Sequence, residues 1–351
     1  MRDWRESDRE LKIVFAHFGK RAPKHLILNI ERCLTLFPYN PIILITNPAC
    51  ILPKMGGIEI HCYTPGEKWQ QLDQNLSHPK NFRENFWLTS LARFLALEDY
   101  LARFTGEIIH VESDVILAKD FPFSKFSNLA KPLAFPVISK TQGIASVLYI
   151  RDHQSARSLV TLTMEMASRD SQTTDMLILR KFYELHPEIT QLLPIGPVGS
   201  NSYQEFTDEK FLAEMNSAVS IFGGCFDGLD IGYFIYGVDP RNDKGKKHLR
   251  KSLPDNFLMI PKTQISFSKA RNFLDIGSLG NECLIPLYSL HIHSKNPSLI
   301  RNSEPAKSLR RGASEYLSPQ TYKFIPKIFI QATGNAIARR IKRINTLGKG
   351  Y

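Results

Sequence analysis

The stretch GEIIHVESDVILAKDFPF, residues 106–123, decides the fold of this chain. Apolar residues flank a histidine, and the acidic triplet Glu112-Ser113-Asp114 follows them directly. An apolar run of this kind is typical of a strand buried inside an α/β sheet. In open α/β sheets, ligands bind at the carboxyl ends of the strands. The stretch therefore predicts a strand that carries two carboxylates, spaced i, i+2, to a ligand-binding edge.

The segments before this stretch predict alternating strands and helices. Strands are expected over 11–19, 41–47 and 58–64, a helix with proline at both ends over 23–38, and a long amphipathic helix over 81–103. This order is typical of a nucleotide-binding type of parallel sheet. The chain lacks a GxGxxG motif, so the dinucleotide fingerprint is absent.

The segments after the stretch extend the same pattern. Two strands are expected within 132–152, helices over 153–168 and 173–187, and a last strand with a polar end over 285–296. Thr173 or Thr174 is the expected N-cap of the second helix. Residues 194–261 are rich in loop-forming sequence. We therefore expect an α/β fold, with a mixed and mainly parallel sheet flanked by helices, over residues 1–300.

Composition places the chain among globular proteins. It has 351 residues, of which 43% are hydrophobic and 23% charged, so it can bury a sizeable core. Its five cysteines form no CxxC pair, which argues against a disulfide framework or a structural zinc site. No signal peptide and no apolar run long enough to cross a membrane is evident. These features favour a cytoplasmic location.

The positive charge is concentrated in one terminal segment. From Lys307 to the end, ten Lys/Arg accompany one acidic residue, Glu315, and this segment supplies +9 of the formal net charge of +11. We expect residues 301–351 to form a basic amphipathic helical tail. Such a segment can bind the inner face of an anionic membrane. It can equally pack as a solvated helix on its own domain, and Pro326 and Gly334 would interrupt a long helix.

The acidic triplet suits a divalent metal. Mg²⁺ and Mn²⁺ prefer oxygen ligands and commonly bridge carboxylates and substrate phosphates. A carboxylate pair at the sheet edge could therefore hold a metal ion and a diphosphate. The alternative is a solvent-exposed turn after a buried strand, because short motifs have a high false-positive risk.

The run from Asn81 to Phe123 resembles the core of glycosyltransferases with the GT-A, or nucleotide-diphospho-sugar transferase, fold. Those enzymes carry an Asp-x-Asp motif after a helix and a strand, and it binds Mn²⁺ or Mg²⁺ together with the donor diphosphate. Here Glu112 stands at the first position and Asp114 at the second. The glutamate keeps the charge but lengthens the side chain.

The resemblance implies further residues of a donor site. Arg93 corresponds to a helix arginine that contacts the donor phosphate or the motif. The late segment HIHSK implies a histidine metal ligand, either His291 or His293, and a lysine for the diphosphate, Lys295. For each of these residues an ordinary structural role is the competing interpretation.

The resemblance also implies residues near the reacting sugar. Asp175, at an expected helix start, matches an acidic residue of retaining relatives that touches sugar hydroxyls or the acceptor. The segment 226–242 is rich in Asp, Gly and aromatic residues that could shape a sugar pocket. If the reaction inverts the anomer, one aspartate must deprotonate the acceptor, and Asp227 is the first candidate, ahead of Asp230 and Asp239.

At the amino-terminal strands the resemblance extends to the fold only. The ends of the first two strands lie where relatives hold the nucleoside, which implies contacts from His17, Phe18, Gly19 and Asn47. Phe18 could pack on a base. Core packing is the competing interpretation for these positions.

The leading hypothesis is a metal-dependent glycosyltransferase of the hexosyltransferase type. It would move a sugar from a nucleotide-sugar, by analogy a UDP-sugar, to a glycan or lipid-linked glycan of polysaccharide biosynthesis. One alternative is a metal-dependent nucleotidyltransferase or phosphohydrolase, although a two-metal site would need more clustered acids. A second alternative is a non-catalytic protein that binds membrane or nucleic acid through its basic tail.

Overall fold

The computed structural model describes residues 11–196, 208–229, 231–232, 263–268, 271, 273–278, 284–293, 295 and 300. The predicted α/β fold is confirmed. A seven-stranded sheet has the strand order β3-β2-β1-β4-β7-β6-β8. Its strands are β1 (Lys12–His17), β2 (Ile42–Thr46), β3 (Glu59–Cys62), β4 (Ile108–Val111), β6 (Leu133–Pro136), β7 (Val147–Ile150) and β8 (Thr190–Leu193).

The sheet is mainly parallel. Strands β3, β2, β1 and β4 run parallel to one another, and β6 and β8 also pair in parallel. Strand β7 runs antiparallel to both β4 and β6. The parallel pairing of β1 with β4 aligns Val14 with His110, so the carboxyl ends of β1, β2 and β4 meet at one edge of the sheet.

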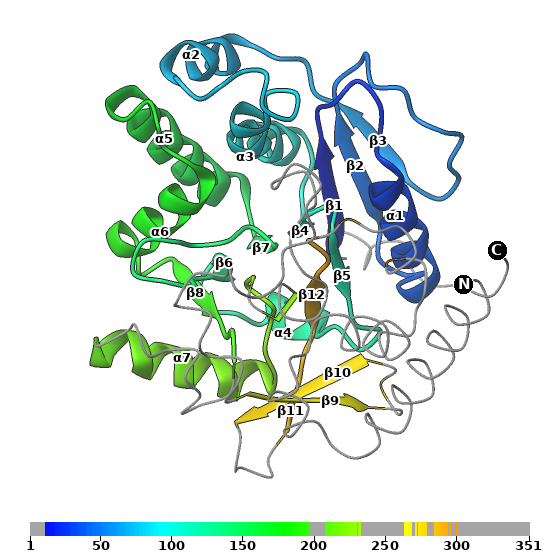
Figure 1. Cartoon of the computed structure of the whole chain (residues 1–351), viewed down its shortest axis with the longest axis vertical. Helices are drawn as coiled ribbons and strands as arrows, with labels where there is room; N and C mark the ends of the chain where they lie inside the picture. Colours follow the sequence, from blue (N-terminus) through cyan, green and yellow to red (C-terminus); the bar gives the residue numbers. More distant parts are fainter. Residues whose placement is uncertain are drawn as a thin grey trace, which may run out of the picture.

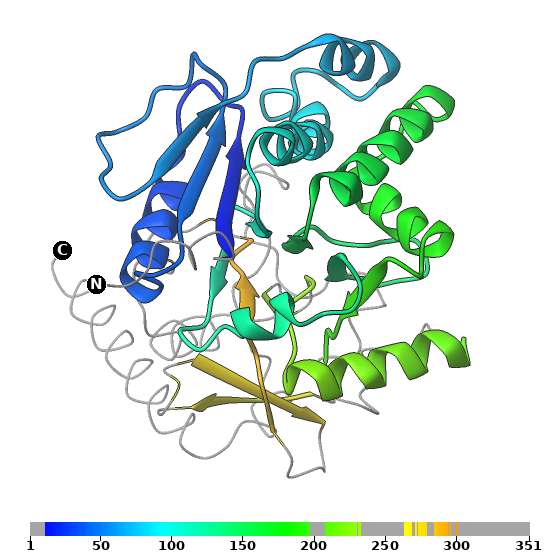
Figure 2. The ribbon, with the colours of Figure 1, turned by 180° about the vertical axis from the view of Figure 1, so that it is seen from behind.

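Helices cover both faces of the sheet (Figures 1 and 2). One face packs against α3 (Phe86–Arg103), α5 (His153–Arg169) and α6 (Asp175–Leu185) in a large apolar core. The other face packs against α1 (Lys24–Leu36) and α4 (Phe123–Ser127). Further helices are α2 (Glu67–Asn75) and α7 (Glu209–Phe222). Burial on both faces explains why the strands are almost uniformly apolar.

A small, separate antiparallel sheet is formed by later strands of the chain. It contains β9 (Thr263–Ser268), β10 (Phe273–Ser278) and β11 (Ile285–Pro286). A separate two-stranded ribbon joins β12 (Ser289–His291) to β5 (Val115–Leu117). Figure 1 shows β12 entering the middle of the molecule beside β5. Apolar side chains of β5, β10 and β12 share a third buried cluster.

The long helix begins later than the sequence indicates. We expected it to start at Asn81, but α3 starts at Phe86. The cause is a left-handed turn, because Arg83, Glu84 and Asn85 have φ of 49°, 56° and 65°. Left-handed residues cannot continue a right-handed helix, so the chain turns before α3 begins.

Two other expectations differ from the structure. The single strand expected over 285–296 is divided into β11 and β12, because the chain leaves β10 and continues to β5. The region expected to be loop-rich contains α7, whose N-cap Asp208 accepts a hydrogen bond from the backbone of Lys210. None of the described helices is long and apolar enough to span a bilayer.

Candidate functional site

The acidic triplet forms a tight turn between two buried strands. Glu112 follows β4, and Asp114 precedes β5. The turn is closed by a backbone hydrogen bond from Val115 to the carbonyl of Glu112, with an N···O distance of 3.0 Å. Because both strands are buried, the turn has a fixed position at the carboxyl end of β4. The Asp114 side chain is almost fully buried, and Glu112 is partly exposed.

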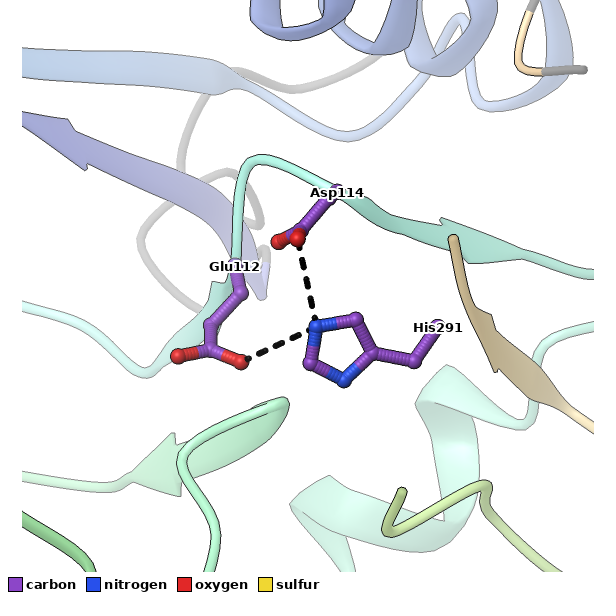
Figure 3. A group of neighbouring side chains, drawn as sticks. All are labelled: Glu112, Asp114 and His291. Carbon is purple, nitrogen blue, oxygen red and sulfur yellow. Dashed lines mark ion pairs between the residues drawn. The ribbon is translucent and has the colours of Figure 1, made fainter. Parts of the chain in front are cut away.

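His291 joins the two carboxylates. It is the last residue of β12 and lies opposite Val115 in the antiparallel ribbon. Its Nε2 atom lies 3.3 Å from Oδ2 of Asp114 and 3.7 Å from Oε2 of Glu112. Figure 3 shows the same ring nitrogen directed at both carboxylates. One ligand atom from each residue lies within 4.8 Å of the others, so the three side chains could hold one metal ion.

The donor set fits a divalent cation of the Mn²⁺ type. Two carboxylates supply hard oxygen ligands, and an imidazole is a ligand that transition metals accept more readily than Mg²⁺ does. Three protein ligands leave other coordination positions for substrate or water. The three side chains are therefore suited to hold a metal while a phosphate also binds it.

Lys295 adds a positive charge beside the acidic pair. Its Nζ atom lies 2.8 Å from Oδ2 of Asp114. Burial alone would raise the pKa of Asp114, but the charges of Lys295 and His291 outweigh it and hold this pKa well below its usual range. Burial would lower the pKa of His291, yet Asp114, together with Glu112 and Asp227, outweighs this effect and raises it. The cluster is thus strongly charged and electrostatically coupled.

Arg93 connects the acidic turn to α6. Its Nη1 atom donates to Oε1 of Glu112 at 2.5 Å, and its Nη2 atom donates to Oδ2 of Asp175. All three side chains are largely removed from solvent. Burial opposes the charge on Arg93, but Glu112 and Asp175 outweigh it and raise the arginine pKa. Arg93 therefore holds both acids in place with one guanidinium group.

Asp175 occupies the first turn of α6, where the sequence predicts it. Thr174 is the N-cap, and its hydroxyl accepts a hydrogen bond from the backbone of Leu177 at 3.3 Å. The helix N-terminus favours a negative charge at this position. Burial nevertheless raises the pKa of Asp175, and Arg93 offsets only part of this rise.

His293 does not join the metal-binding group. Its Nε2 atom lies 3.0 Å from the carbonyl oxygen of Leu229, and its ring stacks on that of His291 with centroids 3.9 Å apart. Burial and the neighbouring His291 hold the pKa of His293 well below its usual range. Of the two predicted histidine ligands, the structure favours His291. His293 lies beyond the end of β12, yet its ring projects to the same side as that of His291, as alternation along an extended run predicts.

Asp227 is buried and surrounded by backbone amide donors. The sequence suggests a base that faces an acceptor, but this side chain is completely buried. Its carboxylate accepts hydrogen bonds from the backbone amides of Ile231, Gly232 and His291. Burial raises its pKa to about 6, against the opposing effect of these bonds. The geometry favours an anchoring carboxylate over an acceptor base. Asp230 and Asp239 lie outside the described residues.

The predicted nucleoside contacts lie at the carboxyl ends of β1 and β2. His17 Nε2 lies 3.0 Å from the carbonyl of Arg21, and Asn47 donates to the carbonyl of Phe18 at 3.3 Å. Phe18 makes edge-to-face contacts with Tyr63 and Trp69, as expected if its role is core packing. Gly19 belongs to the same loop. Nucleoside binding by these residues stays a prediction.

Comparison with known proteins yields solved structures only. No family model matches the chain, and no curated protein matches it in sequence. The galactosyltransferase LgtC, solved with donor and acceptor sugar analogues, matches at 14% identity with a TM-score of 0.40, over 59% of this chain and 83% of that one. The apo glycosyltransferase GlyE of Streptococcus pneumoniae matches at 12% identity with a TM-score of 0.37, over 59% of this chain and 51% of that one.

A mouse xyloside xylosyltransferase matches at 9% identity with a TM-score of 0.37, over 59% of this chain and 93% of that one. All three TM-scores lie below 0.5, so these likenesses do not indicate a function. Evidence for a function comes instead from the arrangement of this chain's own side chains.

The sequence analysis did not identify two residues near the site, His25 and Asn29. His25 lies 3.2 Å, through Nε2, from the hydroxyl of Ser113. Asn29 donates to the carbonyls of Ser113 and Val115 at 3.3 and 2.7 Å. Both belong to α1, one turn apart on one face. Arg32, one turn further along, donates to the carbonyl of Leu117, and such a row of polar residues at i, i+4 and i+7 is the signal that could have identified them.

Asn29 gives a test of how the acidic turn is supported. We expect Asn29→Ala to lower the free energy of unfolding by about 1–3 kcal/mol, because the buried carbonyl of Val115 and the partly buried carbonyl of Ser113 lose this donor. Urea denaturation would measure the change. Thr35→Ala, which removes an exposed hydrogen bond in the same helix, should have a much smaller effect. Equal losses in the two variants would contradict the expectation.

Proposed function

We propose that this chain is a metal-dependent glycosyltransferase that uses a nucleotide-sugar donor. The convergence of Glu112, Asp114 and His291 at the carboxyl edge of the sheet carries the proposal. These residues come from a β4–β5 turn and from a distant strand, β12, so no local sequence pattern places them together. A buried site for one cation at this edge is where an α/β protein binds a phosphorylated ligand.

The surrounding charges support a diphosphate ligand. When bound there, Mn²⁺ or Mg²⁺ would neutralise the negative charge that develops on a leaving nucleoside diphosphate. Lys295, next to Asp114, can place a further positive charge near the same phosphate group. Arg93 holds Glu112 through an ion pair and so fixes the orientation of one metal-binding carboxylate.

The position of Asp175 supports a sugar as the group that is transferred. The Arg93 bridge fixes its carboxylate near Glu112, at the start of α6. We propose that Asp175 contacts hydroxyl groups of the donor sugar or of the acceptor. Retention of the anomeric configuration, indicated by Arg93 and Asp175 from the sequence, stays a prediction. The UDP base, the hexose and the glycan or lipid-linked acceptor are further parts of the proposal that rest on resemblance alone.

The alternative metal-dependent functions receive less support. A two-metal nucleotidyltransferase or phosphohydrolase needs ligands for a second ion about 3.5–4 Å away. Within the described residues, Glu112, Asp114 and His291 are the one group with metal-ligand spacing. Residues 301–351 lie outside the described part of the chain, so membrane or nucleic-acid binding by this tail stays a prediction.

A thermal-shift panel tests the proposed function. Nucleoside diphosphates and nucleotide-sugars would be added with and without Mn²⁺ to the wild type and to Asp114→Ala. We expect one base to stabilise the wild type only with Mn²⁺, by about 2.7 kcal/mol at a ligand concentration 100 times Kd. Asp114→Ala should lose this stabilisation because it removes a metal ligand.

The matched control is Asp73→Ala. Asp73 is a more exposed acid that pairs with Lys80 outside the site, so this variant should keep the full response. Stabilisation by a nucleotide without Mn²⁺, or an unchanged response in Asp114→Ala, would contradict the proposed donor site. If one nucleotide-sugar does stabilise the wild type, an assay for its transfer or hydrolysis would identify the reaction.

A further inference from the structure

Asp227 makes contacts that a role in packing alone does not require. Its carboxylate oxygen Oδ1 accepts a hydrogen bond from Ile231 at 3.2 Å. Its Oδ2 atom accepts two, from Gly232 and from His291, both at 2.9 Å. The side chain is completely buried. A neutral side chain has fewer acceptor sites, so three amide donors explain why an ionisable acid occupies this position.

The bond to His291 holds the metal-binding strand from its open edge. Strand β12 pairs with β5 on one side, where His291 lies opposite Val115. On its other side, the amide of Asp227 donates to the carbonyl of Ser289 at 3.3 Å, and the carboxylate of Asp227 accepts from His291. The backbone of His291 is therefore fixed between β5 and Asp227.

The close packing behind His291 leaves no space for a side chain at position 232. A Cβ atom at Gly232 would lie 2.0 Å from the carbonyl oxygen of His291 and 2.9 Å from Oδ2 of Asp227. Ser146 connects the same residue to the acidic turn, because its hydroxyl donates to the carbonyl of Asp227 at 3.3 Å. The carbonyl of Ser146 in turn accepts from the amide of Glu112 at 3.2 Å.

We propose that Asp227 is a positioning residue for the metal site. It fixes the backbone of His291 so that the imidazole Nε2 faces Glu112 and Asp114 at the separation one cation requires. The inference rests on the proposed function, because it assigns a role within the same site. Groups behind metal ligands fix ligand orientation, and their removal typically weakens metal binding. Such groups usually contact the side chain of the metal ligand, whereas Asp227 holds the backbone amide of His291.

Mn²⁺ affinity, measured by electron paramagnetic resonance of the free ion, tests this inference without a turnover assay. We expect Asp227→Ala to bind Mn²⁺ about 10- to 100-fold more weakly than the wild type. Asp227→Asn should lie between the two. Its amide oxygen can replace Oδ2 and keep the bonds from Gly232 and His291, while its nitrogen faces the amide of Ile231 without accepting from it.

A double-mutant cycle separates positioning from a general effect on folding. His291→Ala removes the imidazole but keeps the backbone amide that Asp227 binds. If Asp227 acts through the imidazole, Asp227→Ala should weaken Mn²⁺ binding in the wild type and have no further effect in His291→Ala. An equal loss in both backgrounds would show a merely structural role and overturn the inference. Asp227→Asn serves the same cycle if the alanine variant does not fold.

Two further variants complete the experiment. Thr163→Ala removes a buried hydrogen bond inside α5, away from the site, and should keep wild-type Mn²⁺ affinity. Asp114→Ala should lose Mn²⁺ binding. If it does while Asp227→Ala and Asp227→Asn bind like the wild type, the positioning role fails and the proposed function stands. If the wild type itself binds no Mn²⁺, both are overturned.

Discussion

Replacing Arg93 with methionine is expected to lower the free energy of unfolding by about 3–5 kcal/mol. Methionine retains much of the apolar volume of the arginine stem but removes the guanidinium group. Glu112 and Asp175 would then be two largely buried carboxylates without the cation that contacts both. The cost arises mainly from these uncompensated charges. Urea denaturation at neutral pH would measure it.

The same helix supplies the control for this prediction. Arg103 pairs with Asp99 near the end of α3, but its side chain is 62% exposed. Arg103→Met should therefore cost less than about 1 kcal/mol. Adding Glu112→Gln and Asp175→Asn to Arg93→Met should restore part of the lost stability, because no unpaired carboxylate then remains. A loss for Arg93→Met as small as that for Arg103→Met would contradict the expectation.

Asp175→Asn should reduce the rate of sugar transfer by about 100-fold or more while leaving Mn²⁺ affinity unchanged. The asparagine oxygen can still accept a hydrogen bond from Arg93, so the bridge to Glu112 is kept. In the proposed function this carboxylate contacts the sugar or the acceptor, and the substitution removes its negative charge. Asp175 does not belong to the group that could hold the metal, which is why its effect should be confined to transfer.

Steady-state kinetics and Mn²⁺ titration on the same preparation would check this prediction. Glu184→Gln is the control, because Glu184 is a more exposed acid on α6 that pairs with Lys181. It should transfer sugar at the wild-type rate. A variant at Asp175 that loses metal binding together with transfer would instead show that Asp175 supports the metal site. Nuclear magnetic resonance of the product anomer would decide separately between retention and inversion.

The central part of the fold could be predicted from the sequence because its elements carry strong local patterns. The apolar runs of β1, β2 and β4, and the amphipathic helix that directly precedes β4, indicate a parallel sheet. The acidic triplet was placed correctly at the end of β4. Its neighbours Arg93 and Asp175 were identified by resemblance, and the structure brings both to Glu112.

The remaining features depend on contacts between distant segments. No pattern in HIHSK indicates that β12 ends at His291 and that His293 instead meets the carbonyl of Leu229. The sequence places Asp227 among turn-forming glycines, and only the folded chain shows the backbone amides around its carboxylate. The late start of α3 follows from three non-glycine residues, Arg83 to Asn85, in a backbone conformation that local propensity disfavours.

The pairing of β5 with β12 has a consequence for the order of folding. Val115 and His291 lie far apart along the chain, and the ribbon between them is three residues long. Closing so large a loop costs conformational entropy, and the few hydrogen bonds of this ribbon do not offset it. Contacts that form earlier, in the main sheet and its helices, must therefore do so. A chain emerging from the ribosome presents both carboxylates long before the imidazole. The three side chains that could hold a metal can therefore come together only after nearly all of the described fold has been synthesised.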